Sequence, residues 1–346
     1  MTAVAMVNNS AGSAGLWTLA WRRLREDRVA MLALAVVCAF FVMLLLSASG
    51  LIASDWERET GVNYAPPSFI GADASGDAVL QINQAPLADN PFDPLLDDIK
   101  AIRAQAAKGG QGAIAPEKRL ATLPFGADKW GHDVILKTIK GGETSIIVGL
   151  VAAVLAVLLG TVFGAFAGFY GGVVDDLFNW FYSVFTAIPS ILMILTVAAV
   201  LQHKGVGTIV LILGLTGWTG PFRLMRAEYM KHKAREYVMA ADAIGASHWR
   251  RMFSHIFPNV SHVALVQLSI LVVGFIKAEV ILSFLGFGVP VGVVSWGSML
   301  NEAQNELILG RWWQLTGAAI AMALLVTAFS LLTDALRDAL DPKVKS

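Results

Sequence analysis

Six long apolar segments constrain the fold of this chain more than any other feature of its sequence. They cover residues 29–52, 145–169, 177–201, 206–222, 262–285 and 312–333. A helix of about 17–25 mostly apolar residues crosses the hydrocarbon core of a bilayer, and each segment reaches that length. No water is available there, so the backbone of a crossing segment must satisfy its own hydrogen bonds, as a helix does. The sequence therefore predicts an all-α polytopic membrane protein with six transmembrane helices.

The composition agrees with a chain whose main partner is the lipid bilayer. Hydrophobic residues make up 56% and charged residues 15% of the chain, whereas soluble domains carry about 25% charged residues. The net charge is zero, which argues against nucleic acid as a partner. The single cysteine, Cys38, lies inside the first apolar segment and excludes an intramolecular disulfide and a cysteine-based zinc site.

Basic residues predict the orientation of the chain in the membrane. Arg22, Arg23, Arg25 and Arg28 precede the first apolar segment, and such residues favour the cytoplasmic side. That segment is too long for a signal-peptide core and is read as an uncleaved anchor. Six crossings then place both termini in the cytoplasm. The predicted divisions are a cytoplasmic N-terminal segment (1–28), a first transmembrane helix (29–52), an extracytoplasmic insert (53–142), a core with the other five transmembrane helices and the loop 223–259 (143–335), and a cytoplasmic tail (336–346).

Two polar stretches carry further expectations. In the insert, Asp93 and Pro94 are suited to begin a helix that Gly109 ends. Between the second and third apolar segments, Asp175 and Asp176 are expected on the cytoplasmic side with no Lys or Arg beside them. Acidic residues count for little in orientation, so the topology stands.

The stretch 223–259 is a basic loop between the fourth and fifth apolar segments. Residues 235–244 favour a helix, Gly245 breaks it, Ser247 is suited to cap a second helix, and Pro258 is expected to end that helix. The loop could rest on anionic lipid headgroups. Its mixture of acidic, basic and apolar side chains favours docking on a protein.

The chain lacks the common signatures of an enzyme. No G-x-x-x-x-G-K-[ST] run is present, so ATP hydrolysis by this chain is not expected, and neither H-E-x-x-H nor G-x-S-x-G occurs. The adjacent His132 and Asp133 are read as an ordinary turn. We therefore expect no catalytic residue, metal site or cofactor in this chain.

Lys277, Glu279 and Ser283 are the candidates for a polar pathway. A charge at mid-membrane costs about 2.5–3.5 kcal/mol or more, so it should face protein or water. Lys277 and Glu279 are two residues apart and poorly placed to pair with each other. They could instead lie near the end of a helix, and both interpretations stay open. A secondary transporter using this pair is the alternative of another class, although no internal repeat supports it.

Residues 237–259, YVMAADAIGASHWRRMFSHIFPN, resemble the cytoplasmic EAA coupling loop of permease subunits of ATP-binding-cassette (ABC) importers. The resemblance is narrower to the C-type permeases for oligopeptides, dipeptides and nickel. It continues through FGADKWGHD, GAFAGFYGGVVDD, AIPSIL, GWTGPFRLMR, AEVILSFLGFGVP, SWGSML and DALRDALDP. Met239 departs from the pattern, because a glutamate is usual at that position.

This resemblance implies a type I importer permease fold in the bacterial inner membrane. A second permease, two ATPase subunits that bind ATP and magnesium, and an extracytoplasmic binding protein would complete the assembly. Tyr237, Ala241, Ile244 and Gly245 are the expected docking contact. The coupling-loop residues implied by the resemblance are Glu236, Tyr237, Ala240, Ala241, Ile244, Gly245, His255 and Pro258.

The resemblance implies import of oligopeptides or dipeptides, with nickel or a peptide antibiotic as the alternatives. The long insert and the LGFGVPVG run are most similar to the short-peptide and microcin C branch. Peptide is favoured over nickel, because the apolar segments hold few side chains that could bind a metal. The role of the insert and the identity of the partner chains stay open.

Overall fold

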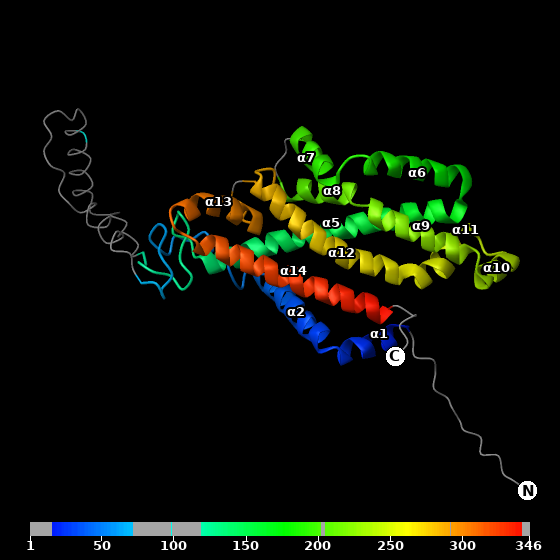
Figure 1. Cartoon of the computed structure of the whole chain (residues 1–346), viewed down its shortest axis with the longest axis horizontal. Helices are drawn as coiled ribbons and strands as arrows, with labels where there is room; N and C mark the ends of the chain where they lie inside the picture. Colours follow the sequence, from blue (N-terminus) through cyan, green and yellow to red (C-terminus); the bar gives the residue numbers. More distant parts are fainter. Residues whose placement is uncertain (1–15, 72–97, 99–118, 202–204, 291, 341–346) are drawn as a thin grey trace, which may run out of the picture. The chain divides into compact units, whose positions relative to one another are not determined.

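The computed structural model describes residues 16–71, 98, 119–201, 205–290 and 292–340, and these residues are mostly helical (Figure 1). The helix expected after Asp93 lies outside the described residues, apart from position 98. The elements are α1 Leu16–Glu26, α2 Arg28–Ala48, α5 Val134–Tyr170, α6 Gly172–Thr186, α7 Ser190–Leu201, α8 Val206–Thr216, α9 Thr219–Lys233, α10 Glu236–Ala243, α11 His248–Arg250, the π-helix η1 Arg251–Ile256, α12 Phe257–Phe284, α13 Trp296–Ile308 and α14 Trp313–Leu340.

The described part of the chain contains five helical stretches that are long and apolar enough to cross a membrane. They are Arg28–Ala48, Val134–Tyr170, Val206–Lys233, His248–Phe284 and Trp313–Leu340, and the bent pair α6 and α7 supplies a sixth if it counts as one crossing. The helical, multi-pass fold predicted from the sequence is therefore confirmed.

The third apolar segment is not the single straight helix that its composition suggests. Helix α6 begins at Gly172, five residues before the expected start at 177, and meets α7 at an angle of 83°. The break falls at residues 187–189, and the residue before a proline is disfavoured in helical conformation. Pro189 therefore divides this segment into two helices.

The loop expected at 223–259 is shorter in the structure, because the flanking helices extend into it. Helix α9 continues to Lys233, and the stretch from His248 to Phe284 is helical throughout. Pro258 does not end a helix, contrary to the expectation. Proline lacks an N–H group and clashes with the preceding turn. The π-helix η1 directly before α12 widens that turn, and the N–H of Phe257 donates to the Met252 carbonyl five residues back.

The described residues form two compact units. The larger unit contains the chain up to Ile52, Thr138–Glu302 and the chain from Ala318 onward, and the smaller unit contains Ala53–Lys137 and Ala303–Gly317. The smaller unit thus combines described parts of the expected insert with residues 303–317, which the sequence did not associate with it.

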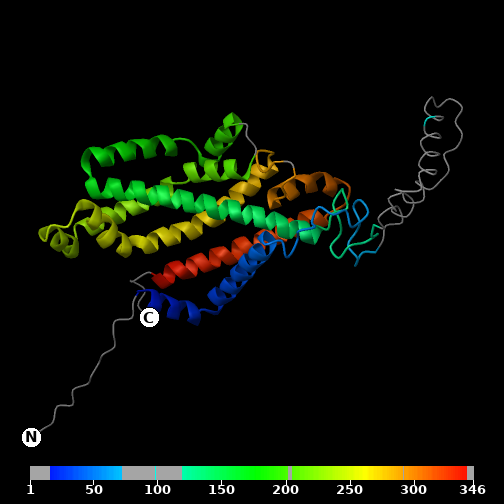
Figure 2. The ribbon, with the colours of Figure 1, turned by 180° about the vertical axis from the view of Figure 1, so that it is seen from behind.

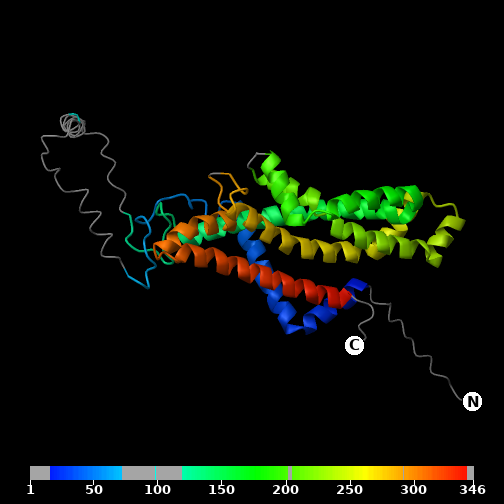
Figure 3. The same ribbon diagram turned by 45° about the horizontal axis from the view of Figure 1, so that its top comes forward.

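In the larger unit, α5 lies against α9 and α12 (Figures 2 and 3). Gly160, Gly164 and Gly168 form one stripe along α5, and a Cβ atom added to Gly164 would lie 2.8 Å from the Phe222 carbonyl oxygen and 2.9 Å from the Arg226 nitrogen. Small residues let helices approach this closely in a membrane. The stripe therefore allows the α9 backbone to pack directly against the α5 backbone.

Helix α6 folds back over this pair and is held there by an ion pair. Arg226 of α9 donates to both carboxylate oxygens of Asp175, from Nε at 2.5 Å and from Nη2 at 2.6 Å. Asn179 donates to the same carboxylate at 2.9 Å. The acidic turn that had no basic neighbour in the sequence is therefore neutralised by a residue 51 positions away.

In the smaller unit, a buried carboxylate organises the turn that precedes α5. Asp128 is fully buried and accepts hydrogen bonds from the backbone N–H of Trp130 at 2.8 Å and of His132 at 3.0 Å. Its second oxygen lies 2.9 Å from the His132 ring and 2.7 Å from Lys137 Nζ, which also donates to Gln314 at 3.1 Å. Burial alone would raise the pKa of Asp128, but His132 and Lys137 outweigh it and hold that pKa well below its usual range.

We predict that Gly164→Ala destabilises the protein although alanine is the better helix former. The added Cβ meets the α9 backbone, and overpacking of this kind costs about 1–3 kcal/mol. Gly274→Ala is the matched control, because nothing lies within 4 Å of a Cβ there. Thermal unfolding in detergent should show a lower midpoint only for Gly164→Ala. Equal midpoints would contradict the close α5–α9 contact.

We predict that Asp128→Asn weakens the smaller unit by about 3–5 kcal/mol, because it leaves Lys137 buried without its carboxylate. The folded pKa lies below the ordinary value of 3.8, so the contribution of Asp128 is complete above that pH and declines as the pH falls below it. Hydrogen exchange of residues 119–137 between pH 3 and pH 7 should reveal this loss. Asp55→Asn, at an exposed carboxylate of the same unit, should leave exchange unchanged.

Candidate functional site

The candidate site is the hairpin between α9 and α12, built from α10 and α11. Gly245 adopts φ +82°, a conformation that favours glycine. Its N–H donates to the Asp242 carbonyl at 2.9 Å, and the Ala246 N–H donates to the Ala241 carbonyl at 3.0 Å, which closes the end of α10. Ser247 then caps α11 by accepting a hydrogen bond from the Arg250 N–H at 3.3 Å. The predicted order of helix, glycine break and serine cap is confirmed.

A buried apolar cluster holds the hairpin on the ends of the long helices. Val238 of α10 packs with Phe169 of α5, Tyr229 of α9 and Met252 and Ile256 of η1. The Tyr229 hydroxyl donates to the Met252 carbonyl at 3.3 Å. Since four separate elements meet in this cluster, the hairpin is fixed in orientation relative to α5, α9 and α12.

The outer side of the hairpin presents large apolar side chains. Ile244 is 86% exposed, Trp249 63%, Met239 55% and Tyr237 38%. We refer to Tyr237, Met239, Ile244 and Trp249 as the docking patch. Single exposed apolar residues are ordinary on a protein surface, but several together mark a surface that another molecule covers.

The other coupling-loop residues predicted from the sequence have different environments. Glu236, Ala240, Gly245 and Pro258 are exposed, and His255 is half-buried. Ala241 is only 4% exposed and faces the chain's own core. The expectation that Ala241 makes a docking contact is therefore corrected. Ala241 lies three residues after Val238, which places both on the buried face of α10.

Met239 and Trp249 were not among the residues expected in the docking contact. Met239 lies next to Val238 and so points away from the buried face. The Trp249 ring lies 4.3 Å from the Phe253 ring, centroid to centroid, and this contact supports the exposed indole. Helical periodicity within α10 could have identified Met239, whereas the position of Trp249 depends on the tertiary fold.

Tyr237 also has a polar contact. Its hydroxyl lies 2.7 Å from Nδ1 of His232 on α9. Partial burial raises the pKa of Tyr237, so the phenol stays protonated at neutral pH and can donate to the ring nitrogen. This contact fixes the tyrosine at the start of α10.

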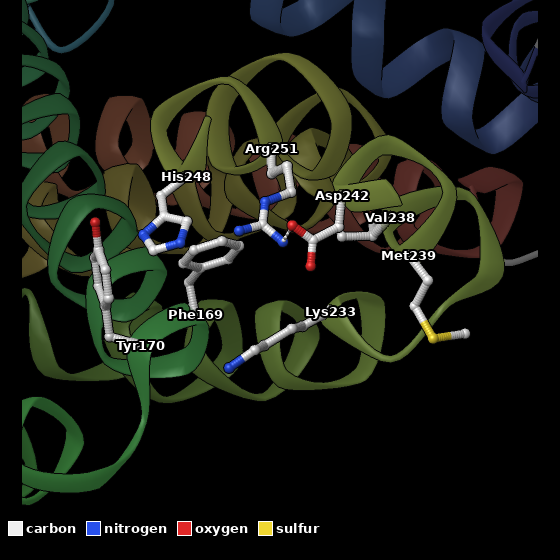
Figure 4. Close-up of a pocket in the computed structure, with 8 residues that line it drawn as sticks. All are labelled: Phe169, Tyr170, Lys233, Val238, Met239, Asp242, His248 and Arg251. Carbon is white, nitrogen blue, oxygen red and sulfur yellow. Dashed lines mark ion pairs between the residues drawn. The ribbon is translucent and has the colours of Figure 1, made fainter. Parts of the chain in front are cut away.

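A cavity of about 220 Å³ opens beside the docking patch (Figure 4). On one side Arg251 donates to Asp242 at 2.6 Å. The Arg251 guanidinium lies 5.5 Å and the Lys233 ammonium 5.6 Å from the centroid of the Phe169 ring. Residues lining the cavity come from α5, α9, α10, α11 and η1: Phe169, Tyr170, Lys233, Val238, Met239, Asp242, His248 and Arg251.

The pathway candidates on α12 separate in the structure. Glu279 is fully buried and accepts hydrogen bonds from the hydroxyls of Ser145 and Ser283, both at 2.6 Å. Ser145 in turn accepts from the Trp296 N–H at 3.2 Å. Lys277 is exposed. As expected from their spacing, Lys277 and Glu279 do not pair, and Glu279 connects α5, α12 and the start of α13.

The described residues contain no group of three or more His, Cys, Asp or Glu side chains that could hold a metal ion. What the hairpin offers is an exposed apolar surface and a cationic cavity on a rigid support. These features suit protein binding.

Comparison with known proteins assigns the family. Residues 160–346 match the family described as binding-protein-dependent transport system inner membrane component, and residues 15–67 match the N-terminal transmembrane domain of oligopeptide transport permease C.

Individual relatives agree with this match. The chain is 35% identical over 221 residues to a dipeptide transport system permease protein of Bacillus subtilis, covering 64% of this chain and 69% of the relative. It is also 35% identical over 221 residues to an oligopeptide transport system permease protein of the same organism, covering 64% of this chain and 72% of the relative. A dipeptide permease of Lactococcus lactis is 29% identical over 325 residues, 94% of this chain and 90% of the relative. The chain belongs to the binding-protein-dependent transport permeases of ABC importers, in their C-type branch.

Proposed function

We propose that this chain is the C-type permease subunit of an ABC importer that moves dipeptides or oligopeptides into the cytoplasm. Two family matches and relatives named as dipeptide and oligopeptide permeases support this substrate class. Nickel and peptide antibiotics are the alternatives for the same architecture. The chain itself acts as a non-catalytic membrane subunit.

The proposed assembly has a second homologous permease, two ATPase subunits and an extracytoplasmic peptide-binding protein. ATP and magnesium bind to the ATPases, and closure of these subunits moves the two permeases between outward-open and inward-open states. The permease needs contacts that differ between the two states, because a ligand or partner shifts an equilibrium only through differential affinity.

The docking patch on its hairpin supports the proposed coupling between the ATPase subunits and the permease. Ile244 is 86% exposed at the tip of a segment whose base is buried. Such an anchor fits a pocket on a partner, as interface hot spots do. Both ends of the hairpin continue into long helices, so a push on Ile244 is transmitted to α9 and α12.

We place the hairpin and both termini in the cytoplasm and the chain in the bacterial inner membrane. The arginines of α1 and the basic residues of the hairpin support this orientation, since such residues favour the cytoplasmic side. Residues 53–142 then form an extracytoplasmic insert, which we propose contacts the binding protein.

We predict that Ile244→Glu lowers peptide-stimulated ATPase activity of the purified complex about tenfold or more. A charge replaces an apolar anchor at the proposed interface, and tenfold corresponds to about 1.4 kcal/mol. Ile244 makes no buried contact, so folding should be unaffected. Co-purification of the ATPases should fall in parallel.

Ile308→Glu is the matched control, because Ile308 is 83% exposed and lies outside the hairpin. It should leave ATPase activity and assembly unchanged. Full activity of the Ile244→Glu complex would remove the docking patch from the mechanism. Equal losses in both variants would indicate a general effect of added charge.

Lys277 is the proposed pathway residue, and Glu279 with Ser283 supports the helix that carries it. We predict that Glu279→Ala lowers thermal stability by about 1–3 kcal/mol, because it strands the buried hydroxyls of Ser145 and Ser283. Lys277→Ala should leave stability unchanged and reduce peptide uptake in proteoliposomes severalfold. Normal uptake by Lys277→Ala would exclude it from the pathway.

A further inference from the structure

We propose that the cavity beside the docking patch receives an acidic side chain of the ATPase subunit that docks on the hairpin. This inference rests on the proposed function and adds a specific charged contact to it. The cavity supports it by its charge, its unsatisfied donor, its size and its position beside the patch (Figure 4).

The cavity carries an excess of positive charge. Lys233 and Arg251 both line it. Among the described residues that line the cavity, Asp242 is the only carboxylate, and Arg251 already pairs with it at 2.6 Å. In the part of the chain that the structure describes, no carboxylate is paired with Lys233. Its ammonium instead lies over the face of the Phe169 ring. One further negative charge would neutralise the site.

Arg251 has donor capacity that its own chain does not use. A guanidinium carries five N–H donors, and one nitrogen of Arg251 binds Asp242. Its Nε is buried and has no hydrogen-bond partner among the described residues. Buried donors without a partner are rare in folded proteins, because each loses its hydration without compensation. The buried Nε shows that the pairing of this guanidinium is incomplete, and a carboxylate entering the cavity would bind the terminal nitrogens of the same group.

The size of the cavity favours a side chain over a free ligand. Its volume of about 220 Å³ is several times the roughly 30 Å³ that one water occupies in the liquid. It is smaller than the about 300–1,000 Å³ of typical small-molecule sites. A glutamate or aspartate side chain fits this space.

The position of the cavity indicates where that side chain comes from. Met239 belongs both to the docking patch and to the cavity lining, and Asp242 of the same helix is 60% exposed at its side chain. A protein that covers Ile244 and Met239 therefore also covers the cavity. Charge complementarity and this continuity favour the docked ATPase over a lipid headgroup, which would approach from the membrane.

A zero-length cross-linking experiment tests the proposal on the full complex. A carbodiimide joins a lysine amine to a carboxylate in direct contact, and mass spectrometry then identifies both residues. We expect an amide link between Lys233 and an Asp or Glu of the ATPase subunit. Lys233→Arg should abolish the link, because a guanidinium does not form it.

Lys231 is the internal control, since its ammonium lies 3.1 Å from Glu228 of the same chain. A Lys231–Glu228 link shows that the reagent reaches the hairpin. In activity assays, Lys233→Glu should reduce peptide-stimulated ATPase activity severalfold, and Lys231→Glu should have little effect. Substitution of the identified ATPase carboxylate by lysine should restore activity to the Lys233→Glu complex.

Several results would overturn the inference. One is a Lys231–Glu228 link without any Lys233 link to the ATPase, and another is a Lys233 link to Asp242 alone. A headgroup site would instead make the effect of Lys233→Glu depend on phosphatidylglycerol in nanodiscs otherwise made of phosphatidylcholine. If Ile244→Glu still impairs coupling in any of these cases, the docking proposal stands and only the charged contact fails. Absence of co-purifying ATPases would refute both.

Discussion

The close approach of α9 to α5 is the contact on which the rest of the larger unit depends. Three glycines one turn apart remove the side chains that would separate the two backbones. With the helices this close, the end of α5 at Phe169 and the end of α9 at Lys233 lie beside each other. Phe169, Tyr229 and Val238 can then form the apolar base of the hairpin. The orientation of the candidate site is thus set by residues deep in the helical bundle.

The hairpin is joined to the long helices by short connections at both ends. Helix α9 is the end of a candidate membrane span, and two residues join it to α10. At the other end of the hairpin, the π-helix η1 passes without interruption into α12. The wider turn of η1 lets Pro258 stay inside a continuous helix. A rigid connection of this kind converts a displacement at the docking patch into a displacement of α9 and α12. This is what a subunit driven by ATP binding elsewhere requires.

Short-range sequence rules predicted much of the fold and of the candidate site. The apolar segments, the left-handed Gly245 and the Ser247 cap follow from short-range rules on length, backbone freedom and capping. Long-range packing was not predictable in the same way. The bend at Pro189 divides a segment that is apolar throughout, and the Asp175–Arg226 pair joins residues 51 positions apart. The cavity draws its charged residues from separate elements, and Ala241 was assigned to the surface because its burial depends on neighbours from other helices.

The treatment of charge distinguishes the hairpin cavity from three other polar sites in the described part of the chain. Asp128 meets Lys137 and His132, Asp175 meets Arg226, and Glu279 accepts from two serine hydroxyls. In each of these sites the donors and acceptors of one chain satisfy one another, as buried polar groups require. At the cavity, within the described residues, Arg251 keeps a buried donor without an acceptor, and Lys233 contacts the face of Phe169 without a carboxylate partner. A site that its own chain leaves incomplete, beside an exposed apolar patch, is what a surface shaped for a charged partner looks like before that partner binds.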